Sequence, residues 1–176
     1  MRELFVIDKK NYIENGTIGR RPSVRGIIIK DGKIAIMHSL KYDYYKLPGG
    51  GIEEGEQLED TLIREVREES GLVVKPDSIK EFGYVRRIEK GKIEDIFVQE
   101  NFYYLCDVEE TAQAQELDDY EEEEYFTLEY VTPEHAISVN ENADHGDKAE
   151  RQTFSGMILR ENRVLQIIKE EVLRSI

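Results

Sequence analysis

The chain has 176 residues, a formal net charge of −14 and an apolar content of 39%. This length allows a sizeable core, and we expect a single domain over residues 1–176. The acidic balance argues against sequence-independent binding to DNA or RNA, because such binding needs many lysines and arginines that face phosphates. An anionic ligand would therefore need a local basic patch or bound cations.

The sequence predicts a cytoplasmic protein without a membrane partner. Cys106 is the only cysteine, so no intrachain disulfide can form, and its apolar neighbours indicate a buried thiol. The first residues contain an early acid and too short an apolar run for a signal peptide. No stretch approaches the roughly 18 apolar residues of a membrane span.

Three short segments of the N-terminal half are predicted to be strands: 23–30, 33–38 and 44–47. The Asp-Gly pair at 31–32 is a hairpin-turn signal between the first two. Pro48 stops the third strand, and three glycines follow at 49–51. A helix is predicted over 57–70, with Gly71 well placed as its C-terminal cap.

Two long segments, 79–89 and 93–108, are predicted to form the arms of a hairpin joined around 90–92. The remaining predicted elements are an acid-rich loop over 111–124, a strand over 125–132, a short helix over 133–137, a polar loop over 143–147 and an amphipathic helix over 158–176. Strands around one central helix, with a second helix at the end, predict an α/β layered domain.

Three glutamates of the central helix are predicted to lie on one side of it. At about 100° per residue, Glu65, Glu68 and Glu69 fall within an arc of about 100°. Leu62, Val66 and Ile63 lie on the adjoining arc and would face the core. The carboxylates are therefore expected at the edge of the buried face.

Such an arc of carboxylates needs a counter-charge. Like charges at i,i+4 destabilise a helix by about 0.2–0.5 kcal/mol per pair. A hard divalent cation such as Mg²⁺ could supply the positive charge, and it would suit phosphoryl chemistry by neutralising substrate oxygens and activating water. The glycines at 49–51 permit a sharp turn that could bring a backbone carbonyl to the same ion. For the glutamates alone, however, a solvated acidic face is the commoner interpretation.

The full spacing resembles the Nudix box at every fixed position. That pattern is a glycine, five residues, a glutamate, seven residues, Arg-Glu, an aliphatic residue, any residue, Glu-Glu, any residue, a glycine and an aliphatic residue. The residues that fill it are Gly50, Glu56, Arg64, Glu65, Val66, Glu68, Glu69, Gly71 and Leu72. The order of elements is similar over about 22–140, with an N-terminal extension and a C-terminal helix outside. The resemblance implies an α/β/α sandwich with a mixed β-sheet.

The resemblance also implies roles for the box residues. Glu65, Glu68 and Glu69 would bind the metal, with the Gly50 carbonyl as a backbone ligand. The ion would be Mg²⁺, with Mn²⁺ as the alternative. Arg64 would orient the glutamates through charge-assisted bonds, so that the catalytic set is Arg64 and the three glutamates. Glu56 would support the geometry of the loop and the helix.

Other contacts are less constrained by the pattern. One acid among Glu121, Glu122, Glu123 and Glu124 is a candidate extra ligand or general base, and the pattern does not fix which. Five arginines, at 20, 21, 25, 86 and 87, could meet phosphates, although a surface arginine is more often an ion-pair residue. The candidate substrate contacts are Arg25, Tyr45 and Arg86.

Three functions follow as hypotheses. The first is a metal-dependent hydrolase that cleaves a phosphoanhydride bond in a nucleoside triphosphate or in a nucleoside diphosphate linked to another moiety. The others are a nucleotide-binding sensor or regulator without turnover, and a family member with different chemistry such as an isomerase. A homodimer is also considered, because the apolar segment 4–7 and the C-terminal helix each need a cover. The equal alternative is that both pack on their own domain.

Overall fold

The strand predicted over 23–30 divides between two sheets in the computed structural model, which describes residues 1–175. β3 (Ser23–Ile27) pairs with β8, whereas β4 (Ile29–Lys30) pairs with β5. The division occurs where two neighbouring carbonyls serve different partners. The Ile27 carbonyl accepts the Cys106 N–H, and the Ile28 carbonyl accepts the Ala35 N–H.

The first sheet mixes parallel and antiparallel pairs. Its strands are β1 (Glu3–Asp8), β7 (Lys80–Lys90), β8 (Ile96–Leu105), β2 (Ile18–Arg20) and β3. β7 and β8 form the predicted hairpin, and β1 lies parallel to β7. β2 and β3 both lie parallel to β8, β2 along its start and β3 along its end. The extension ahead of the box-centred region therefore adds two strands, which the sequence did not predict.

The second sheet is antiparallel and smaller. β5 (Lys33–Ser39) pairs with β4 and with β6 (Tyr44–Lys46), and β9 (Phe126–Val131) lies along its other edge. Asp31 and Gly32 join β4 to β5 with φ values of 51° and 73°. Positive φ at both central residues is what a two-residue hairpin turn with the twist of its strands requires, so the predicted turn is confirmed.

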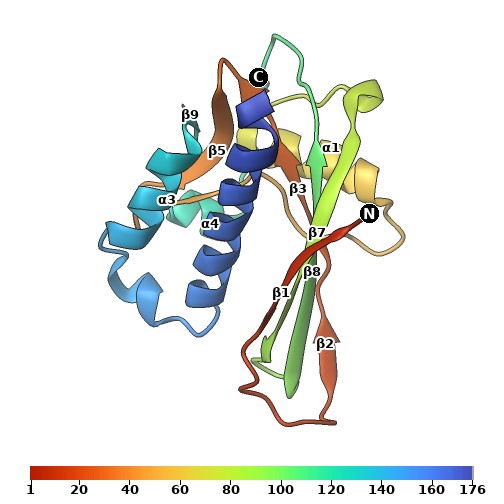
Figure 1. Cartoon of the computed structure of the whole chain (residues 1–176), viewed down its shortest axis with the longest axis vertical. Coiled ribbons are helices and arrows are strands. Elements are labelled where there is room, and N and C mark those ends of the chain that lie inside the picture. Colours follow the sequence, from red (N-terminus) through yellow and green to blue (C-terminus); the bar gives the residue numbers. More distant parts are fainter. Residues whose placement is uncertain (176) are drawn as a thin grey trace.

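Helices cover the two faces of the first sheet. α1 (Leu58–Ser70) and α4 (Phe154–Glu171) lie on opposite sides of β3 and β8, while the far ends of β7 and β8 extend beyond them with β1 and β2 (Figure 1). Because side chains alternate along a strand, Tyr104 of β8 packs with Leu62 of α1, and Tyr103 packs with Val164 of α4. The predicted α/β/α sandwich with a mixed sheet is confirmed.

Several helix boundaries differ from the prediction. The acid-rich loop contains α2 (Asp119–Glu123), because Asp118 and Glu121 form a reciprocal capping box at its start. α3 (Pro133–Asn142) ends five residues later than predicted, and a 3₁₀ turn (Gly146–Glu150) begins within the last two residues of the predicted polar loop. The last helix begins four residues earlier than predicted and is followed by a 3₁₀ turn at Leu173–Ser175.

Both segments that suggested a dimer pack on the chain itself. Leu4 and Phe5 of β1 contact the core cluster that includes Val164 and Ile168 of α4. The apolar stripe of α4 is therefore covered within this chain. The two segments no longer give a reason to expect a homodimer. None of the helices that the structure describes combines the length and apolar content needed to cross a bilayer.

The packing of α4 predicts a clear stability difference between two of its leucines. Leu165 is fully buried, whereas Leu159 is 41% exposed. We expect Leu165→Ala to lower the free energy of unfolding by about 2–5 kcal/mol, because the cavity forms against the sheet. Leu159→Ala should change it by less than about 0.5 kcal/mol. Urea unfolding measures both, and equal effects would contradict the docking of α4 on β3 and β8.

Candidate active site

The box helix α1 is held at the edge of the sheet by its apolar side. Leu62 and Val66 are fully buried against Val24 and Tyr104. The helix ends at Gly71, whose φ of 76° lies in the left-handed region and whose N–H donates to the Arg67 carbonyl. This docking presents the predicted arc of glutamates toward the glycine turn.

The Arg64 guanidinium gathers three carboxylates. It donates two bonds of 2.8 Å to Glu56, through Nε and Nη2. Its Nη1 donates to Glu65 at 2.7 Å and to Glu68 at 3.1 Å. The Gly51 carbonyl accepts a further bond of 3.3 Å from Nη2. The bidentate bond to Arg64 lowers the pKa of Glu56 to about 2, so that this carboxylate stays charged at neutral pH.

The glycine turn runs along the edge of β3 and under Glu65. The Val24 N–H donates to the Gly50 carbonyl at 2.9 Å. Gly49 has a φ of 141°, and a Cβ there would lie 2.1 Å from the Val24 carbonyl oxygen. A Cβ on Gly50 would lie 2.1 Å from Glu65 Oε2. Only glycine allows the backbone to approach both β3 and the helix so closely.

Glu69 occupies a different environment from the other box glutamates. Its side chain is buried, with Oε1 2.5 Å from Lys46 Nζ and Oε2 accepting the Gly49 N–H at 2.8 Å. Burial raises the pKa of Glu69 to about 7, against the opposing effect of the Lys46 ammonium. The innermost box carboxylate is thus tied to the turn and to β6.

Glu121 is the member of the late acidic run that reaches this site. Lys46 Nζ lies 3.4 Å from its Oε1, and the Tyr120 hydroxyl donates to the same oxygen at 2.8 Å. The other three acids lie elsewhere. Glu122 and Glu123 are exposed, and buried Glu124 accepts the Tyr44 hydroxyl at 2.8 Å.

The donors around α1 fit a hard divalent cation in kind, because they are carboxylate and carbonyl oxygens. Their negative charge is met by three side-chain cations. Arg64 pairs with Glu56, Glu65 and Glu68, Arg67 pairs with Glu68 at 3.3 Å, and Lys46 pairs with Glu69. As the side chains lie, the described residues contain no group of three acids, histidines or cysteines arranged to hold a metal ion. A bound ion would share these oxygens with Arg64, Arg67 and Lys46.

The three candidate substrate residues do not gather at one place. Arg25 lies on β3 and its guanidinium donates to the Gly49 carbonyl, so it reaches the box loop. Tyr45 stacks on His38 with ring centres 4.2 Å apart, and its hydroxyl donates to Glu129 at 2.7 Å. Arg86 lies on the face of β7 away from α4 and pairs with two acids, Glu3 and Glu100.

Sequence reasoning missed two residues that hold the loop in place. Lys46 sits within the short apolar strand β6, and a charged residue in such a strand is the signal that could have identified it. Glu161 of α4 accepts the Leu47 N–H at 3.1 Å while pairing with Arg160. An Arg-Glu pair inside an apolar helical stripe was the corresponding signal, although α4 lies outside the family pattern.

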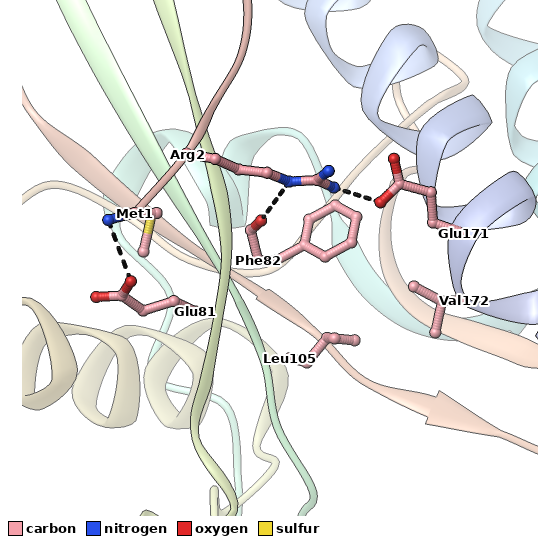
Figure 2. A pocket seen from close by; sticks show the side chains of 7 residues that line it. All are labelled: Met1, Arg2, Glu81, Phe82, Leu105, Glu171 and Val172. Atoms are coloured by element: carbon pink, nitrogen blue, oxygen red, sulfur yellow. Dashed lines mark hydrogen bonds and ion pairs between the residues drawn. The ribbon is translucent and has the colours of Figure 1, made fainter.

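One hollow of about 520 Å³ lies away from these glutamates. Figure 2 shows it between the start of β1 and the end of α4, with Phe82 and Leu105 among its apolar walls. Arg2 bridges it by donating to the Phe82 carbonyl at 3.2 Å and pairing with Glu171. It contains no box residue, so it is not the candidate active site.

Comparisons with known proteins agree with this geometry. The family described as the NUDIX domain matches residues 19–152. An ADP-ribose pyrophosphatase of Methanocaldococcus jannaschii is 36% identical over 78 residues, which are 42% of this chain and 46% of that protein. The aligned segment thus spans about half of the relative's length.

Two solved structures share the fold. A NUDIX hydrolase from Nitrosomonas europaea has a TM-score of 0.55 at 15% identity, covering 83% of this chain and 90% of that chain. A MutT NUDIX hydrolase from Burkholderia pseudomallei has a TM-score of 0.50 at 19% identity, covering 66% of this chain and 85% of that chain. At these identities the likeness concerns the arrangement of helices and strands.

The burial of Glu69 predicts a large cost for removing its cation. Lys46→Met should lower the free energy of unfolding by about 3–5 kcal/mol, because it leaves a buried carboxylate unpaired. Lys41→Met is the matched control, since its partner Glu123 is exposed and such a pair contributes less than about 1 kcal/mol. Adding Glu69→Gln to Lys46→Met should recover part of the loss. Equal effects of the two lysine variants in urea unfolding would contradict this account.

Proposed function

The chain belongs to the Nudix family, and on that premise we propose that it is a metal-dependent pyrophosphohydrolase. Its substrate would be a nucleoside triphosphate or a nucleoside diphosphate linked to another moiety. The observation that carries the proposal is the complete set of box carboxylates gathered at the glycine turn. The relative named an ADP-ribose pyrophosphatase makes ADP-ribose the first compound to test.

The cofactor we propose is Mg²⁺, with Mn²⁺ as the alternative. Glu65, Glu68 and Glu69 would hold it, together with the Gly50 carbonyl. A bound divalent ion supplies positive charge for phosphate oxygens and lowers the pKa of the attacking water. Arg64 keeps Glu56 charged and orients Glu65 and Glu68 through charge-assisted bonds.

Glu69 and Glu121, the two carboxylates that pair with Lys46, would attract the metal ion to the inner part of the site. Lys46 pairs with both Glu69 and Glu121, so a single positive charge faces two carboxylates. The surplus charge gives a divalent ion an advantage at Glu69. We therefore assign Glu121 as the extra acidic group of the metal site. Arg25 on the Gly49 carbonyl lies where it can face substrate phosphates.

Metal dependence gives the main test of the function. Glu68→Gln should lower the turnover of ADP-ribose with Mg²⁺ at least about 100-fold, because it removes one charged ligand while keeping the shape. Glu54→Gln is the control, since Glu54 is exposed in the same loop and fills no fixed position of the box. Release of AMP measures turnover. Unchanged activity of Glu68→Gln, or full activity in excess chelator, would remove the metal mechanism.

A screen of nucleotides distinguishes a hydrolase from a sensor that binds a nucleotide without turnover. Nucleoside triphosphates and sugar-linked nucleoside diphosphates would be tested for both binding and product release with Mg²⁺. Binding of any of them without product would favour the sensor.

The role of Glu121 has its own measurement. Glu121→Gln should raise the Mg²⁺ concentration for half-maximal activity by at least about tenfold, because the site loses one negative charge. Activity at saturating Mg²⁺ should largely return. The neighbouring exposed residue gives the control, and Glu122→Gln should leave both quantities unchanged. A loss of activity that persists at saturating Mg²⁺ would instead identify Glu121 as a general base.

A further inference from the structure

The Lys46 ammonium lies inside the candidate active site and bridges two of its acids. The side chain points inward from β6 and is 6% exposed. Its Nζ lies 2.5 Å from Glu69 Oε1 and 3.4 Å from Glu121 Oε1. Burial opposes the charge of Lys46, but Glu69 outweighs this effect and raises the pKa of the ammonium above its usual value. A full positive charge is therefore held between two carboxylates.

The contact between Lys46 and Glu69 is an ion pair without the geometry of a hydrogen bond. The Glu69 side chain is 1% exposed, and its Oε1 accepts no hydrogen bond from any residue that the structure describes. Its other oxygen accepts the Gly49 N–H at 2.8 Å. Lys46 thus neutralises Oε1 but leaves the lone pairs of this buried oxygen without an aligned donor. Such an oxygen is suited to direct contact with a hard divalent cation.

Glu69 Oε1 cannot hold both this ammonium and a divalent ion. An oxygen that binds Mg²⁺ lies about 2.0–2.1 Å from the ion. With Lys46 Nζ at 2.5 Å from the same oxygen, the two cations would be close neighbours. They would repel each other strongly, because little water lies between them to screen their charges. An ion at Glu69 therefore requires the ammonium to move away.

The neighbouring side chains offer the Lys46 ammonium a second position. Its Nζ lies 4.4 Å from the centre of the Phe126 ring and 5.4 Å from the centre of the Tyr120 ring. It also donates to the Tyr120 hydroxyl at 3.3 Å. Aromatic faces attract an ammonium, most strongly where water is excluded. Lys46 can therefore leave Glu69 and remain among groups that stabilise its charge.

Glu121 is held in place to receive the ammonium. Its Oε2 accepts the Asp118 N–H at 3.1 Å as part of the capping box of α2. Its Oε1 accepts the Tyr120 hydroxyl at 2.8 Å and already lies near Lys46. These bonds to the backbone and to Tyr120 do not involve Glu69. The carboxylate therefore stays in position when the ammonium turns toward it.

We propose that Lys46 is a resident cation that a divalent ion displaces from Glu69. Without the ion, Lys46 supplies the positive charge that the buried carboxylate needs. When the ion binds Glu69, the ammonium moves to Glu121, the Tyr120 hydroxyl and the Phe126 ring. The exchange is coupled, because a buried carboxylate left without any cation is costly.

This inference rests on the proposed metal-dependent function and makes Lys46 a positioning residue. Glu69 keeps the Gly49 N–H on its other oxygen throughout, so the glycine turn keeps its shape. Glu121 then contributes to the metal site by holding the displaced ammonium. A lysine that only fastens β6 to α1 would instead stay on Glu69 when metal binds.

Nuclear magnetic resonance of the full chain with ¹³C-labelled lysine tests the movement. Lys46→Arg keeps the charge and identifies the Lys46 signal by its loss. Addition of Mg²⁺ should move the Lys46 ε-methylene protons upfield, because they approach the faces of the two aromatic rings. The Lys41 signal should stay in place, since Lys41 pairs with the exposed Glu123. A Lys46 signal that does not move upfield at saturating Mg²⁺, with saturation measured by calorimetry, would overturn the proposal.

The affinity for metal alone gives a second test. Paramagnetic resonance of free Mn²⁺ measures binding to the full chain. Lys46→Met should bind Mn²⁺ at least about tenfold more tightly, because the competitor for Glu69 is gone. Lys41→Met removes the same charge from the surface and should change the affinity by less than about twofold.

Circular dichroism checks that both lysine variants fold. Weaker binding by Lys46→Met, or a change equal to that of Lys41→Met, would overturn the proposal. If Lys46→Met does not fold, the resonance test on the wild-type chain decides.

The displacement and the hydrolase function fail separately. An upfield shift of Lys46 with Mg²⁺ but no hydrolysis of any nucleotide would contradict the proposed function and support the displacement. Mg²⁺-dependent hydrolysis with an unmoved Lys46 signal would overturn the displacement and leave the function intact. Absence of Mg²⁺ binding would overturn both.

Discussion

The buried carboxylate of Glu69 is the constraint on which the site depends. A charge beneath the glycine turn is tolerated only because Lys46 and the Gly49 N–H meet it. Lys46 must therefore face inward from β6, and the turn must pass close enough to donate its N–H. The same requirement draws Glu121 and α2 to the site, because Lys46 holds both acids. One buried charge thus fixes the relative positions of β6, the turn, α1 and α2.

The acids of the candidate site form two sets that differ in the cations with which they pair. The outer glutamates share one arginine that is partly open to solvent, so their bonds can rearrange at little cost. The inner pair is buried with a lysine, where each lost contact is expensive. This difference suits a site in which the outer acids exchange partners and the inner pair preserves the shape of the turn.

Much of this arrangement followed from local sequence. The spacing of the box, the cap at Gly71 and the hairpin turn at 31–32 all act within a few residues, and the structure contains the cap and the turn. The division of the first predicted strand did not follow, because it depends on partners at Ala35 and Cys106. The inward direction of Lys46 and the bond from Leu47 to Glu161 are likewise set by distant elements. The bonds of Lys46 to Glu121 and of Leu47 to Glu161 join residues 75 and 114 positions apart, so they leave no local pattern.

The lateness of α4 in the chain has a consequence for biosynthesis. Ile27, Val85 and Tyr103 are covered by this helix, which begins at residue 154. During translation, the face of the sheet that carries them is complete before its cover has been made. Contacts of such large sequence separation form slowly, and an uncovered apolar sheet face invites association with other chains. The nascent chain therefore passes through a stage in which the box helix α1 can already dock, while the opposite face of the sheet still lacks its cover.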